Sequence, residues 1–175
     1  VAANDRAANS LAPMGRRAFF DYWPSRQELA NVQRLYRSVG WGSLAELFIL
    51  DARQYRDRSA GTILGAAQMQ WLLDALGNCT ARFKFICTSV PFTGASADKW
   101  GGFPKDREAL LSAIKERQID GVIFLTADAH YAAVVRVPDN SALREVIVGP
   151  LAAPMGKASG AANQFEYFNN QFLNY

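Results

Sequence analysis

The sequence contains very little histidine and cysteine. Its 175 residues include one histidine, His130, and two cysteines, Cys79 and Cys87. Two cysteines are too few for a disulfide framework or a thiolate zinc cluster. They could pair only if the loop that holds Cys79 folds back, so we interpret both as buried thiols. Within this chain, only His130 can supply an imidazole.

The sequence also lacks a long apolar run and a strong excess of charge of one sign. No apolar run approaches the roughly 20 residues of a membrane span, and no charged-then-apolar leader is visible. The 19 basic and 16 acidic residues give a formal net charge of +3. Because the basic residues are scattered among acidic ones, we expect no nucleic-acid patch and at most a mild attraction to anionic substrates.

The remaining composition is typical of one globular domain. Half of the residues are apolar, 12% are aromatic and 20% are charged, which argues against disorder. A chain of this length can bury a proper core. It starts in an alanine-rich stretch without an initiator methionine and stops at "QFLNY". We expect it to be a piece of a longer protein.

Apolar periodicity predicts alternating strands and helices. The expected elements are a buried strand in 43–53, a helix in 61–78, a strand in 81–91, a long Gly- and Ser-rich loop, a helix that starts near Pro104, and strand-like runs at 121–128, 131–138 and 144–151. This order predicts one α/β domain with a layered sheet, in which hairpins could join the last three strands. We expect residues 1–42 to be a mostly helical and loop lead-in.

Polar residues follow three of the expected strands. Asp51 and Arg53 come after the first strand, Ser89 after the second, and Asp128 and His130 after the third. Ligands of α/β sheets bind outside the carboxyl ends of the strands. On an extended segment, residues 128 and 130 point to the same side, where they offer metal ligands or a base with an orienting partner. The alternative is a histidine that is hydrogen-bonded to its neighbour.

Other motifs are weaker. The glycine-rich stretch 94–102 lacks the Lys-Ser/Thr pair of a phosphate loop, and no serine lies in a G-x-S-x-G elbow. Cys87 has only His130 as a possible base, so a cysteine hydrolase stays open with little support.

Several separate blocks carry a family resemblance. In order, they are "LYRSVGWGSLAELFILDARQYRD", "ILGAAQMQWLLDAL", "KFICTSVPF", "DKWGGFPKDREALLSAI", "VIFLTADAHYAAV" and "REVIVGPLAAP". Together they resemble the C-terminal part of the catalytic domain of alkaline phosphatase D-like metallophosphatases, which have L-D-x-R-x-Y-R, L-G-x-x-Q-x-x-W-L and G-D-x-H blocks. The resemblance implies half of a layered metallophosphatase sandwich. It also implies metal-dependent hydrolysis of phosphate monoesters or diesters.

The resemblance assigns roles to individual residues. It implies that Asp128 and His130 bind metal, with Ala127 where the family has glycine at a tight turn. It makes Arg53 the residue that binds a phosphate oxygen, which suits its planar guanidinium. Asp51 is expected either at this site or as a tether of its loop through Arg56.

The D-x-W block supplies a further expectation. Asp98 and Trp100 match a loop that resembles a wall of the family's pocket, so Trp100 is expected to contact substrate. A structural role for Trp100 is the alternative.

The family also implies calcium and iron as cofactors and a secreted, periplasmic or cell-surface location. Most of the family's metal ligands lie in an N-terminal half that this chain does not contain, although Asn4 could be a remnant of it. We therefore expect that half of the same protein to be a partner, and the isolated chain to have little activity. The second hypothesis is a non-catalytic binding or structural module with a metallophosphatase fold.

Overall fold

The computed structural model describes residues 12–25, 31–138, 140–149, 153–157 and 164–170. Its helices are α1 (Ala12–Tyr22), α2 (Gly65–Asn78) and α3 (Pro104–Glu116), with a short 3-10 helix η2 (Trp100–Gly102). Its strands are β1 (Arg37–Trp41), β2 (Ala45–Ile49), β3 (Phe83–Thr88), β4 (Val122–Thr126), β5 (Ala132–Val137), β6 (Asn140–Ile147) and β7 (Phe165–Asn169). Within these residues, no helix is both long and apolar enough to cross a membrane.

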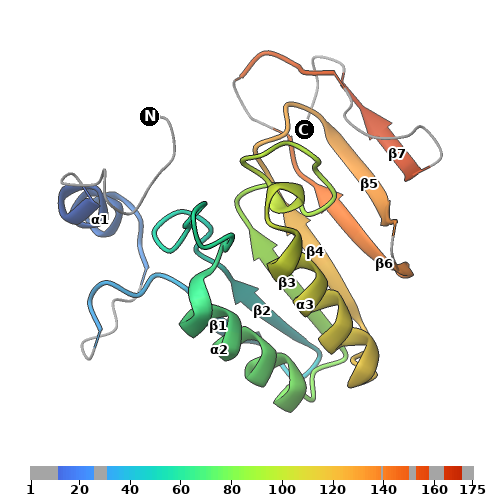
Figure 1. Cartoon of the computed structure of the whole chain (residues 1–175), viewed down its shortest axis with the longest axis horizontal. Helices are drawn as coiled ribbons and strands as arrows, with labels where there is room; N and C mark the ends of the chain where they lie inside the picture. The colour runs from blue at the N-terminus through green and yellow to red at the C-terminus, as the bar shows by residue number, and fades with distance from the viewer. Residues whose placement is uncertain (1–11, 26–30, 139, 150–152, 158–163, 171–175) are drawn as a thin grey trace.

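The seven strands form one mixed sheet in the order β1-β2-β3-β4-β6-β5-β7 (Figure 1). Strands β2, β3, β4 and β6 are parallel. Strand β1 pairs antiparallel with β2, and β5 pairs antiparallel with both β6 and β7. The loops that leave the carboxyl ends of β2, β3 and β4 therefore start at one common edge of the sheet.

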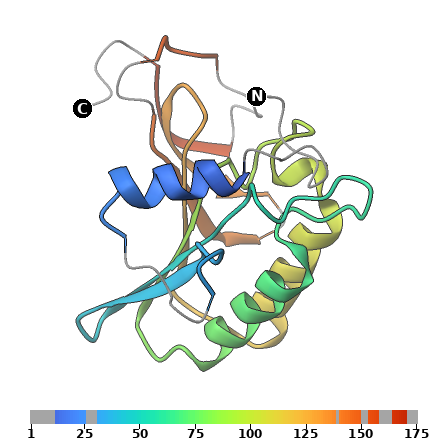
Figure 2. The ribbon, with the colours of Figure 1, turned by 90° about the vertical axis from the view of Figure 1, so that its left-hand side faces the viewer.

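Helices α2 and α3 lie side by side along one face of the sheet, and α1 lies apart from both (Figure 2). The side chains of Phe48, Ile86 and Phe124, from three neighbouring strands, are fully buried under these helices. Leu72 of α2 and Leu110 of α3 are also fully buried in this core. Apolar burial on this face is the main source of stability of the described fold.

The opposite face of the sheet is also apolar but less covered. Phe85 and Cys87 of β3 and Ile123 and Leu125 of β4 point away from the buried set and are only partly buried. Parallel strands with apolar residues on both faces are typical of sheets that are covered on both sides. The described residues thus form one helix-covered side of a layered α/β sandwich, as the sequence predicts.

Three details differ from the sequence predictions. Residues 37–41 of the expected helical and loop lead-in form strand β1, whose residues are mostly exposed and show no apolar alternation. Strand β7 was not predicted. Of the last three predicted strands, β5 and β6 form the expected antiparallel hairpin, but β4 pairs in parallel with β6, which lies between β4 and β5.

Candidate active site

Arg53 and Asp128 meet at the carboxyl edge of the sheet. Arg53 follows β2 and Asp128 follows β4, and β3 separates these two strands. The Arg53 Nη2 atom lies 3.8 Å from Asp128 Oδ1, with the side chains 44% and 39% exposed. Ser89, after β3, is exposed at the same edge. The predicted convergence of Arg53 and Asp128 is therefore present in the structure.

The backbone at Asp128 differs from the predicted extended conformation. Strand β4 ends at Thr126, and Asp128 has φ +68°, in the left-handed region that few residues other than glycine adopt. Ala127, at the position of the family's glycine, has no positive φ, so its methyl group meets no such conformational penalty. Rare conformations of this kind concentrate at functional sites.

His130 lies in the bend between β4 and β5. Asp128 and His130 are exposed, whereas Ala129 and Tyr131 are 4% and 3% exposed. Asp128 and His130 are therefore both accessible to a ligand. Because Asp128 is not in an extended conformation, the alternation of side chains along a strand does not explain this exposure. The His130 carbonyl accepts a hydrogen bond from the Gly156 amide at 2.6 Å. No hydrogen bond joins the imidazole to Asp128 among the described contacts, so the structure does not support the alternative of a neighbour-bonded histidine.

The two residues offer suitable donors for a metal ion but not a full set. A carboxylate and an imidazole suit divalent and trivalent cations, and metal sites in proteins need about four or more ligands. In the part of the chain that the structure describes, no group of three or more His, Cys, Asp or Glu side chains could hold a metal ion. Asn4 lies outside the described residues. A complete centre with Asp128 and His130 therefore needs further ligands from elsewhere.

Asp51 tethers the loop that carries Arg53. Its buried carboxylate accepts hydrogen bonds through Oδ1 from the backbone amides of Arg53 at 3.0 Å and Gln54 at 2.9 Å. The Gln54 side chain donates to Oδ2. The predicted tether is present, but it does not run through Arg56, whose Nε donates to the Ala52 carbonyl at 3.2 Å.

Gln68 of α2 also holds this loop in place through hydrogen bonds. Its side chain is buried, accepts from the Asp51 amide at 2.8 Å and donates to the Asp51 carbonyl at 2.9 Å. Its amide nitrogen also donates to the Leu64 carbonyl at 3.1 Å. One side chain thus satisfies both backbone groups at the point where β2 ends, and it fixes the start of the segment that leads to Arg53.

Glu145 of β6 links the loop after β3 to the end of β4. Its carboxylate is fully buried and accepts from the amides of Phe92 at 2.7 Å and Thr93 at 2.9 Å. It also accepts from the hydroxyl groups of Thr93 and Thr126, the latter at 2.6 Å. Thr126 is the last residue of β4, two residues before Asp128. Glu145 therefore holds the loop after β3 against the segment that presents Asp128.

Trp100 is part of the core, which corrects the prediction that it contacts substrate. Its side chain is 0% exposed, its Nε1 donates to Thr88 Oγ1 at 3.1 Å, and its ring packs against Phe92. A side chain with no exposed surface cannot line a substrate pocket. Asp98 is half-buried, and a hydrogen bond from the Ser96 hydroxyl is the main cause that lowers the pKa of its carboxyl group.

Cys87 does not have the surroundings of a nucleophile. Burial raises the pKa of its thiol, whereas reactive cysteines have lowered pKa values beside cations or helix N-termini. Its Sγ lies 3.9 Å from the Phe85 carbonyl. The structure therefore gives no support to a cysteine hydrolase that uses Cys87 and His130.

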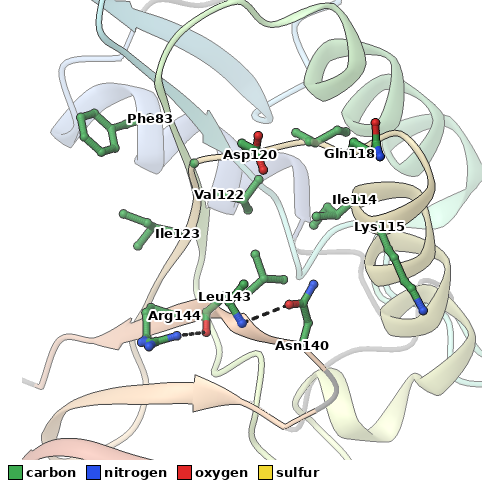
Figure 3. Close-up of a pocket in the computed structure, with 13 residues that line it drawn as sticks. Phe83, Ile114, Lys115, Gln118, Asp120, Val122, Ile123, Asn140, Leu143 and Arg144 are labelled. Carbon is green, nitrogen blue, oxygen red and sulfur yellow. Dashed lines mark hydrogen bonds between the residues drawn. The ribbon is translucent and has the colours of Figure 1, made fainter.

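A large open pocket lies at the amino ends of the parallel strands, opposite the candidate site (Figure 3). It has a volume of about 760 Å³ and lies between the C-terminal end of α3 and the amino ends of β3, β4 and β6. Its polar lining includes Lys115, Gln118, Asp120, Asn140 and Arg144. None of the residues predicted from the sequence to form the active site lines it, so it is separate from the site at the carboxyl edge.

Comparison with known proteins identifies the family of this chain. The family model described as "PhoD-like phosphatase" matches residues 2–174. This chain belongs to the PhoD-like phosphatase family. It is 33% identical over 142 residues to alkaline phosphatase D of Bacillus subtilis (strain 168), an alignment that covers 65% of this chain and 24% of that protein.

A solved structure shows the same fold for this PhoD-like chain. The structure of a PhoD superposes with a TM-score of 0.76 and 24% identity, over 91% of this chain and 39% of that chain. GAP50, the anchor in the inner membrane complex of Plasmodium, has a TM-score of 0.49 and 13% identity, which is too distant to support an argument. The chain thus spans about a quarter of the curated relative and two fifths of the solved PhoD.

Sequence reasoning missed two residues that shape this PhoD-like site. Gln68 is a polar residue among the apolar positions of its helix, between Leu64 and Leu72. Glu145 is a charged residue between Leu143 and Ile147, the apolar positions on the same face of its strand. Buried polar groups need hydrogen-bond partners, so a polar residue within an apolar pattern is the signal that could have identified both.

Proposed function

We propose that the full-length protein hydrolyses phosphate esters with the help of metal ions, two of whose ligands are Asp128 and His130. The proposal rests on membership of the PhoD-like phosphatase family. The observation that carries it is the approach of Arg53 to Asp128 at the carboxyl edge of the sheet. This arrangement puts an anion-binding guanidinium beside a cation-binding carboxylate.

The residues of this chain would have distinct roles. Arg53 binds the phosphoryl oxygens through its guanidinium fork and stabilises the negative charge that develops on them. Asp128 and His130 would hold metal through a carboxylate oxygen and an imidazole nitrogen. When bound, such metal ions polarise a phosphoryl oxygen and lower the pKa of a water molecule. Asp51, Gln68 and Glu145 keep the loops in position through the hydrogen bonds described above.

We also propose the metals, the substrates and the location that the resemblance to this family implies. They are calcium and iron as the metals, phosphate monoesters or diesters as substrates, and a secreted, periplasmic or cell-surface location. The remaining metal ligands would come from an N-terminal half of the same protein. We propose that half as the main partner of this chain, which spans 24% of the curated relative.

A second candidate function is a non-catalytic binding or structural module with the same fold. The observation that favours it is the incomplete ligand set, because no metal-binding group of three side chains exists among the described residues. The two candidates differ in whether the full-length protein contains metal and turns over substrate.

Metal analysis and activity assays of the full-length protein test the proposal. We expect the purified protein to contain stoichiometric metal and to hydrolyse para-nitrophenyl phosphate or its bis-ester, with loss of activity after chelation and recovery on metal addition. The ratio of the two rates identifies a monoesterase or diesterase. A protein that contains no metal and hydrolyses neither compound would support the module instead.

The isolated chain should behave differently from the full-length protein. The described residues of this chain contain an incomplete ligand set and a sheet with one partly covered apolar face, so we expect little or no hydrolysis from this piece. The measurement is turnover of para-nitrophenyl phosphate by the piece and by the full-length protein at equal concentration. Enzyme-like rates from the piece alone would show that the proposed dependence on the other half is wrong.

A further inference from the structure

The side chain of Arg56 is fully buried, and most of its hydrogen-bonding capacity is unused. Its Nε donates to the Ala52 carbonyl at 3.2 Å. Its Nη1 and Nη2 atoms have no hydrogen-bond partner within the described structure. A buried and unpaired charged donor is unfavourable, because it has lost water without gaining an acceptor. This residue therefore needs an explanation other than its contribution to folding.

Arg56 follows the candidate-site residue Arg53 by three positions in the same loop. Its guanidinium carbon lies 5.5 Å from the ring centre of Phe103, which follows the loop that carries Asp98. Burial, and next the positive charge of Arg53, lower the pKa of Arg56, while Asp98 and Asp128 oppose this shift. Because Arg56 shares the loop of Arg53 and its Nη atoms have no partner in the described structure, its charge is available to act on a group bound at Arg53.

We propose that Arg56 is a buried electrostatic residue that strengthens binding of a phosphate-type oxyanion at the neighbouring Arg53. This inference rests on the proposed function, because it assumes that the anion binds at Arg53. A guanidinium stays protonated in proteins. Its field acts more strongly through the protein interior than through water, and salt screens it less. A bound anion would offset the positive charge of Arg56, which is unpaired in the described structure. The unfavourable free energy of burying this charge would then be recovered when the anion binds.

Inorganic phosphate binding to the full-length protein, measured by calorimetry, tests this role without any need for turnover. In Arg56→Met, a flexible apolar side chain replaces the guanidinium. We expect the Kd for phosphate to rise about tenfold, while the melting temperature stays the same or rises because an unpaired buried charge is removed. Arg58→Met is the matched control, since Arg58 is exposed in the same loop. It should change Kd by less than about twofold, because water and salt screen an exposed charge.

Arg56→Lys adds a pH-dependent readout. The buried ammonium loses its proton as pH rises, whereas the guanidinium keeps its charge. The charged groups around position 56 are Arg53, Arg58, Asp98 and Asp128, and they are the same in both proteins. The ratio of variant to wild-type Kd should therefore be near one at low pH and increase as pH rises.

Specific results would overturn the inference. An unchanged Kd in Arg56→Met, an equal effect of Arg58→Met, or a ratio for Arg56→Lys that does not depend on pH would each do so. If Arg56→Met fails to fold or has a lower melting temperature, the guanidinium stabilises the fold and the inference is wrong. A wild-type protein that hydrolyses phosphate esters while Arg56→Met binds phosphate normally would contradict this inference alone. A wild-type protein that neither binds phosphate nor hydrolyses its esters would instead contradict the proposed function.

Discussion

The guanidinium of Arg53 lies 3.8 Å from the carboxylate of Asp128, and the loops that carry the two residues follow strands that are not neighbours in the sheet. Both side chains are more than a third exposed. Exposed ion pairs contribute about 0–1 kcal/mol to stability. Arg53 and Asp128 can therefore exchange this contact for a phosphate and a metal ion at little cost.

Arg53→Lys tests the phosphate-binding role. Lysine keeps the positive charge but cannot offer two parallel N–H donors to one phosphoryl group. We expect kcat/KM for a phosphate ester to fall about tenfold or more in the full-length protein, with unchanged metal content. Arg58→Lys, at an exposed position of the same loop, should leave the rate unchanged. Loss of metal or of folding in Arg53→Lys would instead show that Arg53 is structural.

Gln68→Leu tests how the end of β2 is held. Leucine fits an apolar helix face but leaves the amide and carbonyl of Asp51 without the partner that Gln68 supplies. Because unsatisfied buried groups cost about 1–3 kcal/mol each, we expect a loss of about 2–4 kcal/mol in the free energy of unfolding. Urea denaturation measures this loss. Gln70→Leu, on the exposed side of the same helix, is the control and should cost less than about 0.5 kcal/mol.

An unchanged stability of Gln68→Leu would mean that water or a rearranged loop replaces the side chain. The two hydrogen bonds to Asp51 would then have no role in fixing the loop of Arg53.

Glu145→Gln tests the link between the loop after β3 and the end of β4. The carboxylate accepts from four donors, and glutamine replaces one acceptor oxygen by a donor group. We expect a loss of about 2–3 kcal/mol in the free energy of unfolding, because hydrogen bonds to charged groups are the stronger ones. Glu108→Gln makes the same change on the exposed surface of α3 and should have almost no effect. Equal stability of the two variants would show that Glu145 does not hold the loops together.

The sequence predicted the parts of the fold whose burial follows a simple period. Strands β2, β3 and β4 and helices α2 and α3 have clear apolar patterns, and their order places Arg53 and Asp128 at one edge. Strands β1 and β7 lie at the two edges of the sheet and are largely exposed. An exposed edge strand has little apolar alternation, so periodicity does not reveal it.

The parts of the site that escaped prediction depend on tertiary contacts. Trp100 lies in a glycine-rich segment that has no period, and its burial results from packing against Phe92 and a hydrogen bond to Thr88. The left-handed backbone of Asp128 likewise has no local signal, because aspartate adopts many conformations. The partners of Gln68 are close in space rather than in sequence.

The central claim is that Asp128 and His130 hold metal, and metal content of the full-length protein tests it most directly. Asparagine tolerates the left-handed conformation observed at residue 128, so Asp128→Asn removes the charge with little strain. His130→Ala removes an exposed ring. Both variants should keep the wild-type melting temperature within a few degrees and lose metal and hydrolysis, whereas Asp120→Asn, at the opposite edge of the sheet, should lose neither. Wild-type metal content in both variants, with or without a lower melting temperature, would contradict the account.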